Sequence, residues 1–207
     1  MSIFAGSLVV RLTLWFAWGL LTKFIDLHYD DGLFKRNAAI LAAVVCGVSV
    51  GFGMASHDET FVVYSAIIAG CLLCEKIDNV GFAMSTVLVF GTIATIHVAA
   101  GVPFTLTPDN LIAWGLLTSA YVLDEKLNDA MDQRTWMASS DSRVVRWTYL
   151  FLKHRFASGV LEITAVLIGS ISFFGVLHGV VFNIGYYAMY LLGKAQLARR
   201  VTAVSPA

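Results

Sequence analysis

Charged side chains are scarce in this chain, because Asp, Glu, Lys and Arg make up only 14% of its 207 residues. A soluble domain of this length usually carries about 25% charged residues. Hydrophobic residues make up 58% of the chain, and the mean hydropathy is +0.76. The hydrophobic residues occur in long blocks, several of which approach the roughly 20 residues that cross a bilayer. We therefore expect an all-α, polytopic integral membrane protein.

An excess of charge of one sign is also absent, since 14 basic residues balance 14 acidic ones. A nucleic-acid-binding role is therefore not expected. Cysteine and proline occur three times each. Cys46, Cys71 and Cys74 lie in apolar segments, where buried thiols are a better interpretation than a redox pair. With so few prolines and no long polar linker, residues 1–207 should form a single transmembrane helical domain.

The apolar blocks predict seven transmembrane helices. Five of them lie near residues 7–24, 38–56, 62–74, 80–100 and 111–123. The last block, 157–193, would be about 55 Å long as one helix, whereas the hydrocarbon core is about 30 Å thick. A turn near 175–179, with His178 in it, would divide this block into the sixth and seventh helices.

The positions of the basic residues predict the orientation. With seven helices, thirteen of the fourteen basic residues fall on one side of the membrane, which the positive-inside rule makes cytoplasmic. The opposite loops carry acids such as Asp58, Glu59 and Asp109, and no lysine or arginine. We therefore predict that the amino terminus is outside and the carboxyl terminus inside. Residues 132–156 would then be a cytoplasmic interfacial segment with basic and aromatic side chains.

A short acidic string occurs twice, as EKIDN at 75–79 and as EKLND at 125–129. Each copy follows an apolar run, so the sequence predicts two-helix internal repeats. The string AWGLLT, at 17–22 and again at 113–118, hints at a third copy in a different register. Parallel repeats are common in transporter folds.

The repeated acids are candidate metal ligands. If the first copy is helical, Glu75, Asp78 and Asn79 share one face. Carboxylates at the carboxyl end of a helix are unfavourable, each by roughly 0.3–1 kcal/mol, so a positive partner is expected. Oxygen ligands suit Mg²⁺ or Ca²⁺. The candidate ligands are Glu75, Asp78, Asn79, Glu125, Asn128, Asp129 and Asp132. The alternative is ordinary solvated helix ends, with Lys76 and Lys126 balancing their neighbours.

Two further groups of residues are candidates. The basic residues of the interfacial segment lie among aromatic side chains, which is typical of the headgroup layer and also suits a phosphate-binding site. These residues are Arg143, Arg146, Lys153 and Arg155. Arg11 and Glu162 are ionisable groups inside apolar runs, where a charge costs at least about 2.5–3.5 kcal/mol at mid-depth. They are functional candidates for that reason.

Three functions fit these observations. The first is a Mg²⁺- or Ca²⁺-dependent transferase that acts on a phosphorylated, lipid-soluble substrate. The second is a cation-coupled transporter or channel that uses Glu162 and Arg11, and the third is a non-catalytic subunit of a membrane complex. Aspartates at cytoplasmic helix ends resemble those of the UbiA-type prenyltransferases. The Asn-Asp-x-x-Asp-x-x-x-Asp run of that family is absent here, so we assign no family.

Overall fold

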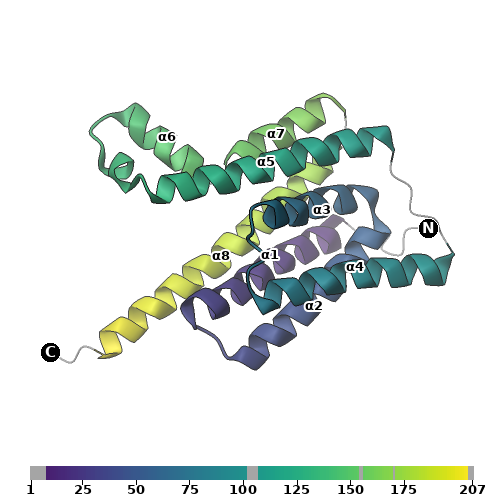
Figure 1. The fold of residues 1–207 in the computed structure, drawn as a ribbon, viewed down its shortest axis with the longest axis horizontal. Helices are drawn as coiled ribbons and strands as arrows, with labels where there is room; N and C mark the ends of the chain where they lie inside the picture. Colours follow the sequence, from purple (N-terminus) through teal and green to yellow (C-terminus); the bar gives the residue numbers. More distant parts are fainter. Residues whose placement is uncertain (1–7, 102–106, 154–155, 170, 205–207) are drawn as a thin grey trace. The chain divides into compact units, whose positions relative to one another are not determined.

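The computed structural model describes residues 8–101, 107–153, 156–169 and 171–204, and their side chains over 8–101, 107–152, 159–169 and 171–200. The described residues form α-helices and one short 3-10 helix, with no strand among them (Figure 1). The elements are α1 (Leu8–Asp31), α2 (Arg36–Ser56), α3 (Asp58–Leu73), α4 (Val80–Ala100), α5 (Pro108–Asp132), η1 (Thr135–Ser139), α6 (Arg143–Lys153), α7 (Phe156–Leu167) and α8 (Phe173–Val204). The all-α prediction is confirmed.

Four helices are long and apolar enough to cross a membrane: α1, α2, α4 and, over Phe173–Arg200, α8. Large apolar side chains on them are open to the surroundings, for example Val87 at 70% and Val98 at 83% of full exposure. Such surfaces are expected to face lipid. By contrast, α3 has 16 residues and α7 has 12, or roughly 24 and 18 Å of helix. The count of seven spans and the orientation therefore remain predictions.

The chain divides into two compact units, and their members alternate along the sequence. Unit 1 comprises Met1–His57, Asp78–Phe104 and Leu177–Ala207, and unit 2 comprises Asp58–Ile77 and Thr105–Val176. All four candidate spans belong mainly to unit 1. The helices that precede the two acidic strings, α3 and α5, both belong to unit 2, and α4, which follows the first string, belongs to unit 1.

Small residues bring α2 and α4 of unit 1 into close contact. A Cβ atom added at Gly47 would lie 2.6 Å from the carbonyl oxygen of Ser85, and one added at Gly51 would lie 2.6 Å from that of Val89. Glycines four residues apart commonly let membrane helices approach in this way. The contact residue number increases by four on both helices, from Gly47 to Gly51 and from Ser85 to Val89, so α2 and α4 are parallel.

The other contacts of unit 1 set the directions of α1 and α8. The indole Nε1 of Trp18 donates a hydrogen bond to Ser49 Oγ at 3.0 Å, and Gly53 packs against the same indole ring. The hydroxyl of Thr22 lies 3.9 Å from Cys46 Sγ. These contacts run in opposite directions along the two helices, so α1 and α2 are antiparallel.

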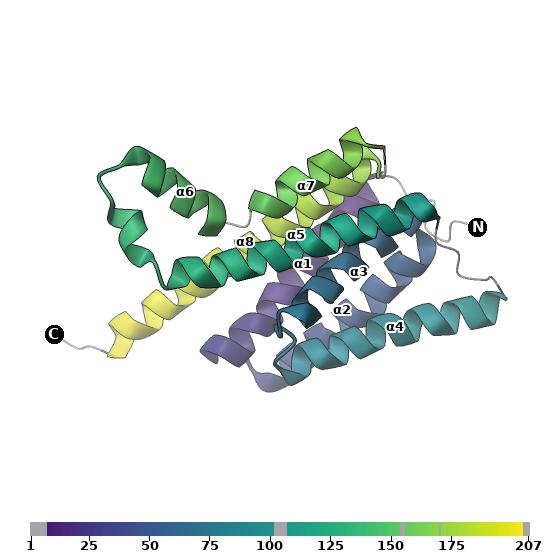
Figure 2. The same ribbon diagram turned by 45° about the horizontal axis from the view of Figure 1, so that its top comes forward.

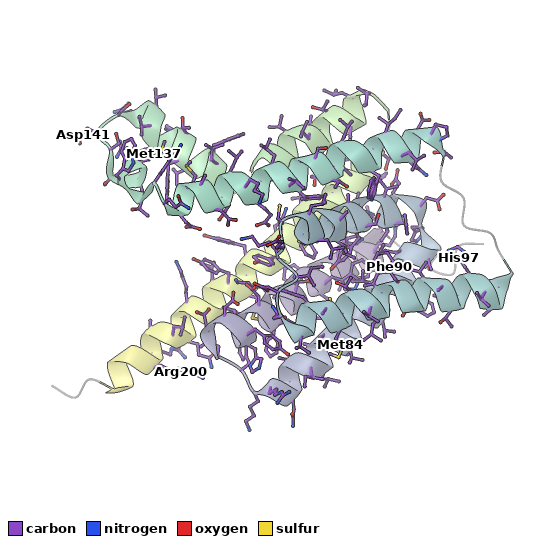
Figure 3. All side chains as sticks on the ribbon, viewed as in Figure 1. Met84, Phe90, His97, Met137, Asp141 and Arg200 are labelled. Carbon is purple, nitrogen blue, oxygen red and sulfur yellow. The ribbon has the colours of Figure 1, made fainter. Side chains whose placement is uncertain are left out.

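Helix α8 follows α1 in the same direction. The ring of Trp15, near the start of α1, stacks on His178 with centroids 5.1 Å apart. At the other end, the guanidinium of Arg200 donates to the backbone oxygen of Leu33 at 2.9 Å (Figure 3). In unit 1, α1 and α8 are therefore parallel.

The predicted turn near residues 175–179 is wrong. The chain turns between Leu167 and Phe173, where Gly169 has a φ of 76°. A left-handed glycine of this kind commonly ends a helix. Gly175 and His178 lie inside α8 instead, and the His178 side chain is 2% exposed. The glycines on both sides of His178 suggested a turn, but the positive φ that ends the helix occurs at Gly169.

Candidate functional site

The first acidic string does not form a helical face, so that part of the prediction is wrong. Helix α3 ends at Leu73, and Glu75 adopts a left-handed φ of 57°. The side chain of Asn79 then accepts a hydrogen bond from the backbone N–H of Phe82 at 2.9 Å and caps α4. An asparagine at this position stabilises the start of the next helix. Glu75, Asp78 and Asn79 therefore lie in a connecting loop.

The second acidic string is helical, as predicted, because α5 continues to Asp132. Asp124 and Glu125 are buried, at 2% and 8% exposure. Farther along α5, Asp129 accepts a hydrogen bond from Lys76 Nζ at 2.8 Å. The lysine of the first repeat thus neutralises an acid of the second.

A divalent-cation site at these acids remains a prediction. Over the ranges that the structure describes, no group of three or more His, Cys, Asp or Glu side chains is placed to hold a metal ion. The Asn128 and Asp132 side chains extend along the same helix as Asp129. These side chains still offer oxygen ligands to a cation. The first acidic string, however, does not present Glu75, Asp78 and Asn79 on one helical face as predicted.

Cys71 and Cys74 lie near the end of α3, and neither forms a disulfide bond within the described residues. Cys74 Sγ lies 3.8 Å from the backbone oxygen of Val122 on α5. Cys74 is buried, at 8% exposure, and structural cysteines buried in apolar surroundings are usually inert. The geometry agrees with the interpretation of these thiols as packing groups.

The clearest polar centre of unit 2 is built on Glu162. This residue lies on α7 and is 3% exposed. The hydroxyl of Tyr121 on α5 donates a hydrogen bond to Glu162 Oε1 at 2.9 Å. Asp124, one turn along α5 from Tyr121, is close enough for its carboxyl group to interact electrostatically with that of Glu162. We call these three residues the Glu162 centre.

The Glu162 centre is held in place by a close helix contact. A Cβ atom added at Gly70 of α3 would lie 2.7 Å from Tyr121 Cβ, so the backbone of α3 approaches α5 beside this tyrosine. The other side of Tyr121 reaches α7 through its hydroxyl. Three helices therefore fix the position of one hydrogen-bond donor. Glu162 was predicted from the sequence and Tyr121 was not, because a tyrosine in an apolar helix is common.

Arg11 belongs to unit 1, on α1, and is half-buried. Its Nε atom is inaccessible and has no hydrogen-bond acceptor within the described part of the chain. Arg11 lies one turn before Trp15, whose ring stacks on His178. Arg11 belongs to unit 1 and Glu162 to unit 2.

The basic residues of the interfacial segment are only partly described. Arg143 and Arg146 lie on α6 and are exposed, whereas the Lys153 side chain and all of Arg155 fall outside the described residues. Helix α6 lies beside η1 and the carboxyl-terminal part of α5 within unit 2 (Figure 2).

Unit 1 holds a polar cluster that was not predicted from the sequence. Lys23 forms an ion pair with Asp26 on the same helix. Its ammonium group lies 5.2 Å from the ring centroid of Tyr186 and 5.6 Å from that of Tyr190, both on α8. Cation–π contacts of this length stabilise a desolvated lysine.

Comparison with family models, with curated proteins and with solved structures finds no match to this chain.

Proposed function

We propose that this protein is an ion-coupled membrane transporter in which Glu162 binds the coupling ion. The observation that carries the proposal is the burial of Glu162 in an apolar helix, with its carboxyl group hydrogen-bonded to Tyr121. An ionised carboxylate without a counter-charge is costly in such surroundings. It is therefore stabilised when an ion binds to it.

We propose a proton as the coupling ion. Calcium takes six to eight oxygen ligands and magnesium needs a near-ideal octahedron, whereas a proton needs one basic atom. The Tyr121 hydroxyl occupies Oε1 of Glu162, and the proton would bind Oε2. Asp124 is a second buried carboxyl group on the same centre and provides a proton acceptor one helical turn away.

The directions of the helices support a polytopic arrangement with seven spans. Because α2 and α4 are parallel, the chain from residue 57 to residue 79 must return from one end of that pair to the other. Helix α3, at roughly 24 Å, and the residues that follow it are long enough for this return. In unit 2, Glu59 at the start of α3 accepts from both Ser172 N, at 3.0 Å, and Ser172 Oγ, at 2.8 Å. Helix α7 therefore runs opposite to α3.

The proposal is tested by proton flux in proteoliposomes that contain a pH-sensitive dye. An imposed pH gradient, with and without a membrane potential, should drive flux through the wild-type protein above that of empty vesicles. Glu162→Gln should reduce the flux at least tenfold, because the amide does not take up a proton. Tyr121→Phe should reduce it less, because the carboxyl group remains.

A matched control is Asp109→Asn. This substitution removes an exposed acid from the first turn of α5, which carries no residue of the Glu162 centre. Its flux should equal that of the wild type. Wild-type flux in the Glu162→Gln variant, or no flux above empty vesicles for the wild type, would contradict the proposal. The transferase and the complex subunit stay predictions, since no contact among the described residues favours either of them.

A further inference from the structure

Thr118 on α5 has a buried hydroxyl group that needs a hydrogen-bond partner. Its side chain is 7% exposed, and its Oγ1 atom is inaccessible and makes no hydrogen bond within the described part of the chain. Other helical threonines donate to the carbonyl oxygen four residues earlier, as Thr13, Thr95 and Thr164 do. Buried polar groups almost always bond to protein or to ordered water. The Thr118 hydroxyl therefore requires a ligand from outside these residues.

The repeated AWGLLT string shows how a threonine at this position can be satisfied. Thr22 ends the copy at 17–22, and its hydroxyl lies 3.9 Å from Cys46 Sγ on α2. Thr118 ends the copy at 113–118. Leu117 and Ala120, near Thr118 in the sequence, are 0% exposed and carry no polar side-chain atom. The hydroxyl of Thr118 thus lies in the packed interior of unit 2.

Thr118 belongs to a row of polar side chains on α5 that includes part of the Glu162 centre. Tyr121 lies one turn after Thr118 and Asp124 one turn after Tyr121, a spacing at which side chains are neighbours on the helix surface. Long helical side chains lean toward the preceding turn, which for Tyr121 is the turn of Thr118. The Tyr121 hydroxyl bonds Glu162 on α7, and α7 lies beside α5 (Figure 2). Leu123, on the other side of α5, is 46% exposed. The row therefore follows the buried side of the helix.

We infer that the Thr118 hydroxyl binds a water molecule that delivers protons to Glu162. A buried water usually makes two to four hydrogen bonds. The Thr118 hydroxyl would donate to the oxygen of this water. The water would donate to Oε2 of Glu162 and to the hydroxyl oxygen of Tyr121, whose own hydrogen is given to Oε1.

The proton step conserves atoms and charge. An excess proton on the water passes to the ionised carboxylate of Glu162, which leaves a neutral water and a neutral carboxyl group. Thr118 takes up no proton itself, so it is a positioning residue that holds the water near Oε2. The inference deepens the proposed function and rests on it, because Glu162 is taken as the proton-binding group.

The test measures access of protons to Glu162 by infrared spectroscopy of the full chain in a supported bilayer. The carboxyl C=O stretching band of Glu162 is identified by its loss in Glu162→Gln. When the acidic buffer is changed from H₂O to D₂O, deuteration of the carboxyl group shifts this band, and the rate of the shift is recorded. The measurement needs no transport across the membrane.

Thr118→Val removes the hydroxyl and nearly keeps the shape of the side chain. It should slow the exchange about tenfold, which is the factor that one hydrogen bond to the water contributes. Thr118→Ser keeps the hydroxyl and should exchange like the wild type. The matched control is Thr164→Val on α7, whose hydroxyl donates to Val160 O at 2.9 Å, and its exchange rate should be unchanged.

Wild-type exchange in Thr118→Val would overturn the inference, and so would equal slowing by Thr118→Ser, which would indicate a packing effect. A higher unfolding temperature of Thr118→Val would also overturn it, because the hydroxyl would then have no ligand to lose. A sodium-dependent rise in the unfolding temperature of the wild type, absent from Thr118→Val, would identify a cation in place of water. A wild type without proton flux whose exchange still depends on the Thr118 hydroxyl would contradict the transporter and support the bound water.

Discussion

At the scale of single residues, Tyr121 and Glu162 depend on each other because each satisfies a buried polar atom of the other. Tyr121→Phe removes only the hydroxyl, yet it leaves a buried carboxyl group without its donor. A hydrogen bond of this kind contributes about 1–3 kcal/mol to the free energy of unfolding. Glu162→Gln should cost less, because the amide oxygen still accepts the bond.

A double-mutant cycle measures this coupling by unfolding in mixed micelles. We expect the two substitutions to be non-additive by about 1 kcal/mol. Tyr187→Phe is the control, since Tyr187 lies on α8 at 50% exposure, and it should leave the free energy of unfolding unchanged. Additive effects of Tyr121→Phe and Glu162→Gln would show that the Tyr121 hydroxyl bonds the carboxyl group no more strongly than the amide.

The ion pair between Lys76 and Asp129 should contribute little to stability. Their side chains are 36% and 47% exposed, and partly exposed pairs are usually worth below about 1 kcal/mol. Asp129→Asn should therefore lower stability by less than that amount in the absence of metal. A larger loss in the thermal unfolding curve would mean that Asp129 has a second stabilising role.

The predicted divalent-cation site is tested on the same residues. If Mg²⁺ or Ca²⁺ binds these acids, a hundredfold excess over Kd should stabilise the protein by about 2.7 kcal/mol. The double variant Asp78→Asn, Asp129→Asn should lose this response while keeping its fold. If neither cation changes the unfolding temperature of the wild-type protein, the metal hypothesis is wrong.

At the scale of elements, the glycines of α2 decide how closely α4 can pack. A Cβ atom at Gly51 would lie 2.6 Å from Val89 O and 2.7 Å from Thr92 Cβ. The backbone of one helix would have to move to relieve this steric overlap. Gly51→Ala should therefore lower the free energy of unfolding by about 1–3 kcal/mol. Reaction of a fluorogenic thiol reagent during heating is a suitable measurement, because Cys46 and Cys74 are buried in the fold.

Gly91→Ala on α4 provides the matched control. Nothing lies within 4 Å of a Cβ atom at Gly91, and replacing glycine by alanine in a helix is favourable by up to about 1 kcal/mol. This variant should be neutral or slightly more stable. Equal destabilisation by the two alanines would show that backbone flexibility, and not helix contact, explains the effect at Gly51.

Comparison of predicted and observed elements shows which signals the sequence carried. The apolar blocks at 38–56 and 80–100 predicted α2 and α4 closely, since hydropathy alone separates these helices from their loops. The end of α3 was missed because it depends on the left-handed φ of Glu75 and the capping side chain of Asn79. Neither changes the hydropathy of the segment.

The candidate site was predictable to the same degree. Glu162 is conspicuous as one acid in an apolar block, so it was found from its chemistry. Its partner Tyr121 is 41 residues away, and a tertiary contact of this kind leaves no periodic pattern in one sequence. The buried pair Asp124 and Glu125 resembled ordinary acids at a helix end, because burial is decided by the helices packed around them.

At the scale of the whole molecule, the directions of the helices constrain the number of crossings. In unit 1, α1 and α8 run one way and α2 and α4 the other, so if all four candidate spans cross the membrane, the chain from 57 to 79 has to recross it. The chain from 101 to 172 then has to leave and return to the same side, with either two crossings or none. Two crossings, by α5 and α7, give seven spans, and none gives five.

Cysteine labelling decides between these numbers. Single cysteines at Lys35, Asp58, Asp109 and Asp141, all exposed, are placed in a chain whose native cysteines are replaced by Ala. Lys35→Cys and Asp58→Cys lie at opposite ends of α2 and define the two sides for a membrane-impermeant maleimide. With seven spans, position 141 should react from the side of Lys35 and position 109 from the side of Asp58. With five spans, both should react from the side of Asp58, because α5 and α7 would not cross. The orientation follows from the same measurement, since the positive-inside rule places Lys35 in the cytoplasm.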